Sequence, residues 1–268
     1  MSASDLIFDG GAGETFTRDI YGTTKGDVRL HVLWHDLVAE IPALRDSRLR
    51  VIDVGAGTGL IAARVAELGH EVTLCEPSRD MLEKARATMR EAGLTERVHV
   101  VQATLQDLES EVLGEFDLVM CHAVLEWLAE PREALKSITA LLKPNGYLSL
   151  LFYNRNAALL KRALRGDFAH LLEEPGTHRI DREGPTPLDP DRVRSWLSRY
   201  GLRVQSKSGI RIFHDHLTEP LSNGDVSFEK LLEIETRFRK QQPFASLGQH
   251  VHFVCHKGPR RTSAPGQR

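Results

Sequence analysis

The junction between residues 50 and 60 constrains the fold more than any other part of this chain. Arg50–Val54 is a short run of valine and isoleucine around one aspartate, which predicts a buried strand. The turn Gly55-Ala56-Gly57-Thr58-Gly59 and a helical pattern follow at once. Glycine lets the backbone of such a turn pass close to a ligand, and the start of the helix presents free N–H groups. The junction is therefore typical of domains that bind a nucleotide.

The same alternation of strand and helix continues as far as residue 152. Strands are expected at 50–54, 71–75, 98–102, 116–121 and 147–152. Helices are expected at 60–68, 78–92 and 132–142. Because helices join successive strands, the connections are right-handed and the sheet is parallel, with helices on both faces. The pattern predicts an α/β, Rossmann-like fold with a central, mostly parallel sheet.

An acid ends the second strand, where a nucleotide ligand would place its ribose. Glu76 stands 17 residues after Gly59, and a carboxylate there can accept hydrogen bonds from both ribose hydroxyls, or be a surface acid. NAD would use the same acid, but its fingerprint needs another glycine where this chain has Leu60. Asp53 also has two interpretations, because it can contact the ligand or cap the amides of the turn.

Four features in chain order resemble the class I methyltransferases. They are Asp53–Gly59, Glu76, Phe116–Cys121 followed by His122–Trp127, and Leu141–Gly146. The resemblance implies S-adenosylmethionine as the cofactor, with the fourth strand at the floor of its pocket. His122 is then a general base, a cofactor-contacting imidazole or an ordinary loop histidine.

Further segments resemble the family of bacterial tRNA 5-carboxymethoxyuridine methyltransferases, from about Phe16 to Val254. These segments are Tyr21–Gly26, His122–Trp127, Leu150–Asn154, Gly209–Asp215 and Leu231–Arg237. The resemblance implies transfer of a methyl group to the carboxylate of 5-carboxymethoxyuridine, at the wobble position of tRNA. It implies cofactor contacts at Arg29, Gly55, Ala56, Glu76, Leu105, Gln106 and His122. To these the glycine-rich junction adds Asp53 and Gly57.

The chain is expected to form one methyltransferase domain over residues 16–256. Its parts are an N-terminal cap or lid (16–48), a cofactor-binding core (49–152) and a substrate side with the last strands (153–256). On the substrate side, helices are expected at 156–165, 191–200 and 228–240, β-like segments at 203–213 and 250–256, and a loop at 173–191. Residues 1–15 are expected to be flexible and residues 257–268 disordered.

The implied reaction needs no general base, because a carboxylate is already ionised at neutral pH. The enzyme has only to hold the carboxylate in line with the methyl group at near-attack distance. Tyr153, Asn154 and Arg211 are the candidates for this task. Their alternative roles are a strand-end aromatic, a turn residue and a solvated arginine.

Charge is distributed unevenly along the chain. The net charge is −9 over residues 1–152 and +7 over residues 153–268. A basic half can mark a polyanionic partner, although solvated faces would give the same count. An anticodon loop exposes both its bases and its phosphates. The candidates for contact with tRNA are Tyr21, Lys25, Lys161, Arg162 and Arg165.

Two alternatives remain open at this point, a methyltransferase of a small carboxylic acid or metabolite and a binding module without catalysis. The cysteines Cys75, Cys121 and Cys255 are an odd, widely spaced set in apolar runs, which favours buried thiols over disulfides or a metal site. No apolar stretch is long enough to cross a membrane. We therefore expect a cytoplasmic protein without a metal or a membrane partner.

Overall fold

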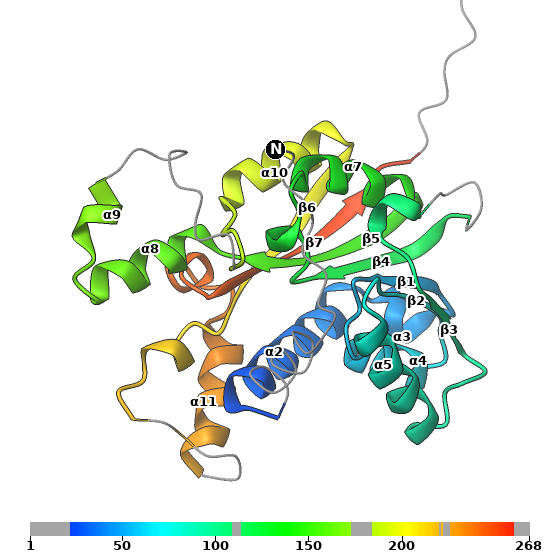
Figure 1. Ribbon diagram of the computed structural model, residues 1–268, viewed down its shortest axis with the longest axis horizontal. Coiled ribbons are helices and arrows are strands. Elements are labelled where there is room, and N and C mark those ends of the chain that lie inside the picture. The colour runs from blue at the N-terminus through cyan, green and yellow to red at the C-terminus, as the bar shows by residue number, and fades with distance from the viewer. Residues whose placement is uncertain (1–21, 109–113, 173–183, 220, 222–225, 260–268) are drawn as a thin grey trace, which may run out of the picture.

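Seven strands of the described chain form one sheet in the computed structural model, in the order β3-β2-β1-β4-β5-β7-β6 (Figure 1). The structure describes residues 22–108, 114–172, 184–219, 221 and 226–259. The strands are β1 (Arg50–Val54), β2 (Glu71–Cys75), β3 (Val98–Val101), β4 (Phe116–His122), β5 (Leu142–Tyr153), β6 (Leu202–Ile210) and β7 (His250–Lys257). The first five strands are parallel, and β7 runs antiparallel between β5 and β6. The predicted mostly parallel, Rossmann-like sheet is confirmed.

The sheet order changes direction between β1 and β4. From β1 the chain moves outward to β2 and β3, and it then returns to the other side of β1 as β4. In open α/β sheets, ligands bind outside the carboxyl ends of the strands at this point. Val54 at the end of β1 pairs with Cys121 of β4, so the glycine turn and His122 leave the sheet at the same edge.

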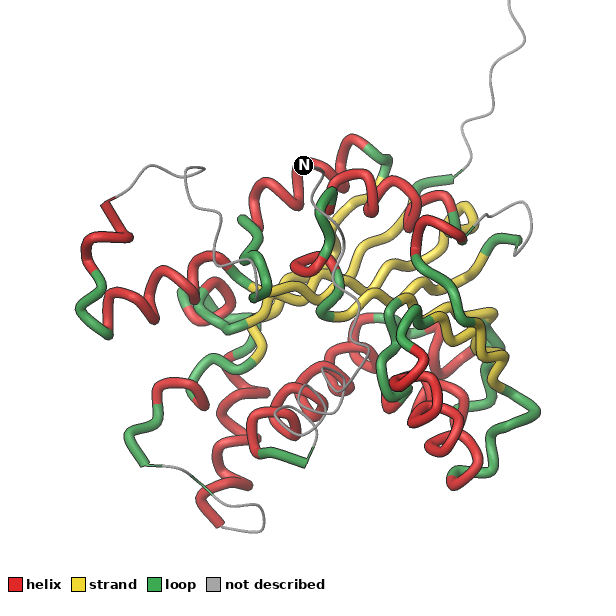
Figure 2. The backbone as a smooth tube through the Cα atoms, viewed as in Figure 1, coloured by secondary structure: helices red, strands yellow, loops and turns green. Residues whose placement is uncertain are grey.

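Helices cover both faces of this sheet, as Figure 2 shows in red above and below the yellow strands. They are α2 (Thr24–Glu40), α3 (Ala43–Asp46), α4 (Leu60–Glu67), α5 (Arg79–Glu91), α7 (Pro131–Ala140), α8 (Arg155–Leu164), α9 (Phe168–Leu172), α10 (Pro190–Arg199) and α11 (Val226–Phe238). One buried cluster includes residues of α2, α4 and α5, and a second includes residues of α7 and α10. Neighbouring strand residues such as Val51 and Ile52 belong to opposite clusters, because successive side chains of a strand alternate between faces.

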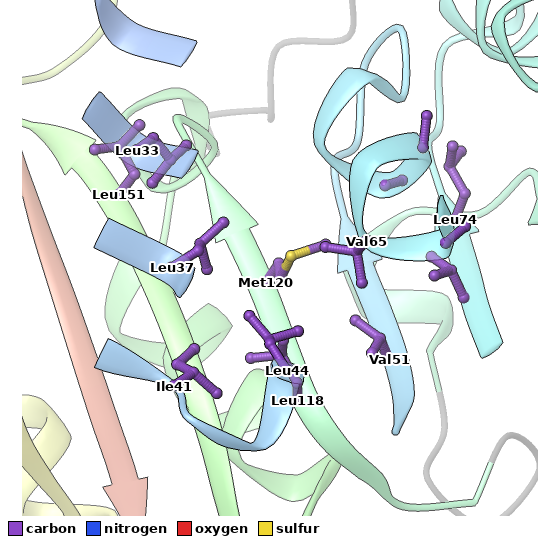
Figure 3. Packing of buried hydrophobic residues seen from close by; sticks show 14 of the residues in the cluster. Leu33, Leu37, Ile41, Leu44, Val51, Val65, Leu74, Leu118, Met120 and Leu151 are labelled. Atoms are coloured by element: carbon purple, nitrogen blue, oxygen red, sulfur yellow. The ribbon is translucent and has the colours of Figure 1, made fainter. Parts of the chain in front are cut away.

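Helix α2 lies across the sheet with an apolar face toward it. Its N-cap, Thr23, accepts a hydrogen bond from the Gly26 amide. Leu33 and Leu37 lie one turn apart and pack with strand residues that include Met120 and Leu151 (Figure 3). This packing fixes the start of α2 over the carboxyl edge of the sheet, which is the edge that carries the glycine turn.

Some element bounds differ from those expected. Strand β5 begins at Leu142 rather than 147, since the expected turn lies inside the paired run with Asn145 at φ 61°. Strand β6 stops at Ile210 because Arg211 takes a left-handed φ of 59°. Helices α3 and α9 were not predicted, since four or five residues are too few to show a helical period.

Parts of the expected chain lie outside the described residues. These are the whole predicted flexible N-terminus (1–15), residues 16–21 of the predicted cap, residues 173–183 of the predicted loop and residues 260–268 of the predicted tail. Helix α10 begins at Pro190, one residue earlier than expected, with Asp189 as its N-cap. Within the described chain, no helix combines the length and the apolar character that crossing a membrane requires.

Candidate active site

The glycine turn after β1 is held by its neighbouring strand. The amides of Gly55 and Ala56 both donate to the carbonyl of Cys75, at 2.9 and 3.1 Å. Gly55 has φ 67°, and a Cβ added to it would lie 2.5 Å from a methyl carbon of Val124. Only glycine fits this position. These two turn amides are bonded within the protein, and the predicted free N–H groups at the start of α4 are not affected by those bonds.

Glu76 completes the turn from the end of β2. Its carboxylate accepts from the amide of Gly57 at 2.9 Å and from the amide of Ser78 at 3.0 Å, and the residue is buried. Each carboxylate oxygen can accept more than one hydrogen bond. Glu76 can therefore support the turn and still accept from a ribose hydroxyl.

A second buried acid lies beside this carboxylate. Asp53 is the residue before the last of β1, and 3% of its surface is exposed. Burial raises the pKa of Asp53 to about 8, and the nearby charge of Glu76 adds to the rise. A buried carboxyl group with a raised pKa is characteristic of a functional site.

A cavity of about 60 Å³ opens at the carboxyl ends of β1 and β4, below the first turns of α2. Predicted cofactor-binding residues that line it are Arg29, Asp53, Gly55, Ala56 and His122. Ala123 also lines it, and its left-handed φ of 58° is unusual for a residue other than glycine. The structure thus brings five of the nine predicted residues around one cavity.

The other four predicted residues lie toward β2 and β3. Gly57 is bonded to Glu76, whose amide donates to the carbonyl of Val101 in β3. Leu105 and Gln106 belong to a 3-10 turn after β3 (Leu105–Asp107), where Leu105 is buried in the core and Gln106 is exposed. These residues do not line the 60 Å³ cavity, and their contact with a cofactor stays a prediction.

A chain of buried polar side chains extends from His122 into the protein. His122 Nε2 lies 2.7 Å from Ser149 Oγ, which lies 2.8 Å from His252 Nε2. His252 Nδ1 in turn lies 2.9 Å from Asp36 Oδ2, and Arg239 Nε donates to Asp36 Oδ1 at 2.7 Å. Burial opposes ionisation of Asp36, but the hydrogen bond from His252 and the contact with Arg239 hold its pKa well below the usual range.

The sequence analysis missed the members of this hydrogen-bonded series other than His122. One signal was present, because Asp36 belongs to the apolar face of α2, and an acid there requires a buried partner. The partners themselves come from strands and helices more than 100 residues away.

A second polar group forms where α2, β6 and α11 meet, and we call it the substrate-side corner (Thr24, Arg211–Asp215 and Glu235). Glu235 of α11 is fully buried and accepts from the amides of Ile212, Phe213 and His214, at 2.7 to 2.9 Å. His214 Nε2 lies 3.0 Å from Thr24 Oγ1. The corner thereby joins the Arg211–Asp215 segment to the start of α2.

Arg211 is paired within the corner. Its guanidinium donates to both carboxylate oxygens of Asp215, at 2.5 to 3.0 Å, and both side chains are largely buried. The pKa of Asp215 lies well below its usual range, since hydrogen bonds from His214 and Arg211 outweigh burial. Burial lowers the pKa of His250, and the positive charges of Arg29 and Arg211 lower it further. The charges of Arg29 and Arg211 are therefore both felt at His250.

The remaining positioning candidates differ from each other. Tyr153 is half-buried at the end of β5, with its ring centroid 6.1 Å from that of His250. Asn154 is fully buried, and its amide nitrogen donates to the carbonyls of Ser246 and Gly248, at 3.0 and 2.8 Å. Both of its N–H groups are thus used to hold the loop before β7, so Asn154 supports the fold in this structure.

Glu126 was quoted in the sequence motif but given no role. It lies in a short 3-10 turn after β4, buried, and its Oε2 has no partner among the described residues. Burial raises its pKa to about 7, against the opposing charge of Arg29. It is a second buried carboxyl group close to Arg29.

The predicted RNA contacts are spread over two elements. Lys25 is half-buried in the first turn of α2 and does not line the cavity. Lys161, Arg162 and Arg165 lie at the end of α8, which with α9 projects from the left of the molecule in Figure 1. Leu164 and Phe168 are exposed on the same projection. Tyr21 lies outside the described residues.

Comparison with known proteins identifies the family. A methyltransferase domain model matches residues 52–148. The chain is 37% identical over 245 residues to the tRNA 5-carboxymethoxyuridine methyltransferase of Escherichia coli strain K12, covering 91% of this chain and 94% of that protein. This chain belongs to that family. A ubiquinone biosynthesis O-methyltransferase of Xanthomonas axonopodis is 32% identical over 62% of this chain and 68% of its own length.

Solved structures agree in fold. Magnesium protoporphyrin IX methyltransferase from Synechocystis, with bound SAH, gives a TM-score of 0.63 at 14% identity, covering 94% of this chain and 96% of its own. The same enzyme with bound SAM gives 0.58 at 16% identity, covering 94% and 93%. The protein is a methyltransferase dependent on S-adenosylmethionine.

Proposed function

We propose that this enzyme methylates the carboxylate of 5-carboxymethoxyuridine at the wobble position of tRNA, giving the methyl ester. The observation that carries the proposal is the 37% identity over 91% of the chain, which reaches far beyond the general methyltransferase domain at residues 52–148. A sequence similarity limited to the methyltransferase domain at residues 52–148 would support only the use of S-adenosylmethionine as the cofactor. A tRNA substrate also favours location in the cytoplasm.

The residues near the cavity suit a carboxylate acceptor. S-adenosylmethionine supplies a methyl group on a positively charged sulfur when it is bound. The acceptor is ionised at neutral pH, so the protein needs to orient it rather than remove a proton. Arg29 lines the cavity, and Arg211 is held by Asp215, which partly offsets its charge. We assign to Arg211, with Tyr153, the orientation of the acceptor, and Arg29 stays a predicted cofactor contact. Asn154 contributes by holding the neighbouring loop.

The end of α8 suits the nucleic acid around the target nucleotide. Lys161, Arg162 and Arg165 carry positive charge on a projecting helix, and such charges contact phosphates without regard to sequence. The half-buried Lys25 lies at the other side, next to the substrate-side corner. In this proposal the anticodon loop reaches the cavity between these two regions.

The deciding experiment is methyl transfer from labelled S-adenosylmethionine to tRNA that contains 5-carboxymethoxyuridine without the ester. We expect label on that nucleoside, and mild base should release it as methanol, because an ester hydrolyses readily. tRNA with unmodified uridine at the wobble position is the matched control, and it should remain unlabelled.

A variant shows whether the methyl transfer comes from this enzyme or from a contaminating methyltransferase. Arg29→Ala should lose most transfer to tRNA. If wild-type protein binds S-adenosylmethionine but leaves the modified tRNA unlabelled, the tRNA assignment is wrong. Labelling of a small carboxylic acid under the same conditions would then identify a metabolite methyltransferase, and no labelling of either would favour a module that only binds the cofactor.

A further inference from the structure

In the buried series of hydrogen-bonded side chains that ends at His122, the donor and the acceptor of each hydrogen bond can be assigned. It joins four elements, with Asp36 on α2, His252 on β7, Ser149 on β5 and His122 on β4. Asp36, His252 and Ser149 have at most 1% of their surface exposed, whereas the His122 ring lines the cavity. Each hydrogen bond in such a chain has one donor and one acceptor, so one fixed end determines the rest.

The fixed end is Asp36. Its carboxylate is held ionised by Arg239 and has only lone pairs to offer, so His252 Nδ1 donates to it. A cationic His252 would give the buried group of Arg239, Asp36 and His252 a net positive charge, which is costly away from water. The neutral ring instead presents a lone pair on Nε2, and Ser149 donates its single hydrogen there.

The direction continues to the cavity. Because Ser149 has used its hydrogen, its oxygen accepts from His122 Nε2. His122 then carries its proton on Nε2 and a lone pair on Nδ1, which has no partner among the described residues. We infer that Asp36, His252 and Ser149 are positioning residues that fix this tautomer and make His122 Nδ1 the hydrogen-bond acceptor for the ammonium group of the cofactor.

The sheet order supports the choice of the ammonium group. Glu76, the predicted ribose acceptor, directly follows β2, and β4 lies on the other side of β1. A cofactor with its ribose at Glu76 therefore extends its methionine end past the glycine turn toward His122. The inference rests on the proposed cofactor contact at His122. It does not depend on the identity of the methyl acceptor.

The first test is the tautomer itself, read by nitrogen NMR on full-length protein labelled with ¹⁵N-histidine, without cofactor or tRNA. The His122→Asn variant assigns the His122 signals. We expect Nδ1 unprotonated and Nε2 protonated. Ser149→Ala should give a mixture of tautomers, and Ser206→Ala should not, although it also removes a buried serine hydroxyl, one on β6 with no partner among the described residues. A protonated Nδ1 in wild type, or an unchanged tautomer in Ser149→Ala, would overturn the inference.

The second test measures binding by calorimetry. Ser149→Ala should weaken the binding of S-adenosylmethionine about two- to tenfold, the range expected for one hydrogen bond. Binding of 5′-methylthioadenosine, which has the ribose but no amino acid, should be unchanged. Equal loss for both ligands, or loss for neither, would contradict the assignment of His122 to the methionine end. A failure to methylate tRNA would affect neither measurement, so the two proposals can fail separately.

Discussion

The glycine turn and the substrate-side corner are both polar and largely buried, but they are built in different ways. In the turn, Gly57 bonds to Glu76, only 19 residues away, and the Cys75 carbonyl holds two further amides. In the corner, Thr24 meets His214 across 190 residues, and Glu235 of α11 accepts from three amides that follow β6. The turn thus follows from local sequence, whereas the corner forms only when distant elements have packed.

This difference in construction corresponds to a difference in expected function. The turn provides features that any methyltransferase of this fold needs, and the general domain model covers it. The corner lies outside residues 52–148, in segments that distinguish this family. Changes in the turn should therefore affect cofactor binding, and changes in the corner should affect stability and the acceptor.

The largest effect is expected for Glu76→Ala. The substitution removes a charged acceptor from the ribose and from the amides of Gly57 and Ser78. Hydrogen bonds to a charged group contribute about 1.5–3 kcal/mol each, so affinity for S-adenosylmethionine should fall about 100-fold or more. Calorimetric titration measures the loss. Glu76→Asp is the control and should retain most affinity, and equal losses for both variants would exclude the ribose role.

The corner is tested next by Glu235→Gln. A glutamine has one acceptor oxygen and an NH2 group that cannot accept, so at least one of the three amides loses its partner. The free energy of unfolding should fall by about 1–3 kcal/mol, measured by urea denaturation. Glu233→Gln changes an exposed acid on the same helix and should leave stability unchanged. If Glu235→Gln weakens cofactor binding as strongly as Glu76→Ala, the two regions are not separate.

The same contrast explains what the sequence could predict. Strands β1 and β2 have the expected bounds, and two predicted residues of the turn, Gly55 and Ala56, line one cavity, because the pattern of apolar residues and glycine is local. The pattern also shows that Asp36 and Glu235 are acids among buried positions. It cannot show that Arg239 and His252 are the partners of the first, or that the amides after β6 are the partners of the second. Those pairings depend on how α2 and α11 pack.

A smaller effect is expected at the end of α8. Neutralising Lys161, Arg162 and Arg165 together to glutamine should weaken tRNA binding about tenfold and reduce the salt dependence of log Kd by up to about 3, one for each lost phosphate contact. The control makes the same charge change on α5, at Lys84, Arg86 and Arg90, on the cofactor side. Filter binding at several salt concentrations measures both. Equal losses would mean that only net charge matters.

The smallest effect is a change of stability with pH, and it distinguishes Asp53, the buried aspartate beside the glycine turn, from Asp36, the buried aspartate on α2. The pKa of Asp53 is raised to about 8 in the folded protein, from an ordinary value of 3.8. Its contribution to stability is therefore complete below about pH 4 and is lost as the pH rises to about 8. Asp53→Asn cannot ionise, so without cofactor its stability relative to wild type should increase over this interval, by about 1 kcal/mol or more.

Asp36 should behave in the opposite way. Its pKa is depressed, so its contribution is fully present above pH 4 and is lost only as the pH falls below that value. Asp36→Asn should consequently lower stability by the same amount at pH 5 and pH 8. Urea denaturation of both variants at several pH values compares the two profiles. A difference between Asp53→Asn and wild type that stays constant from pH 5 to pH 8 would show that Asp53 is ionised throughout, and the turn would then hold two adjacent carboxylates rather than one.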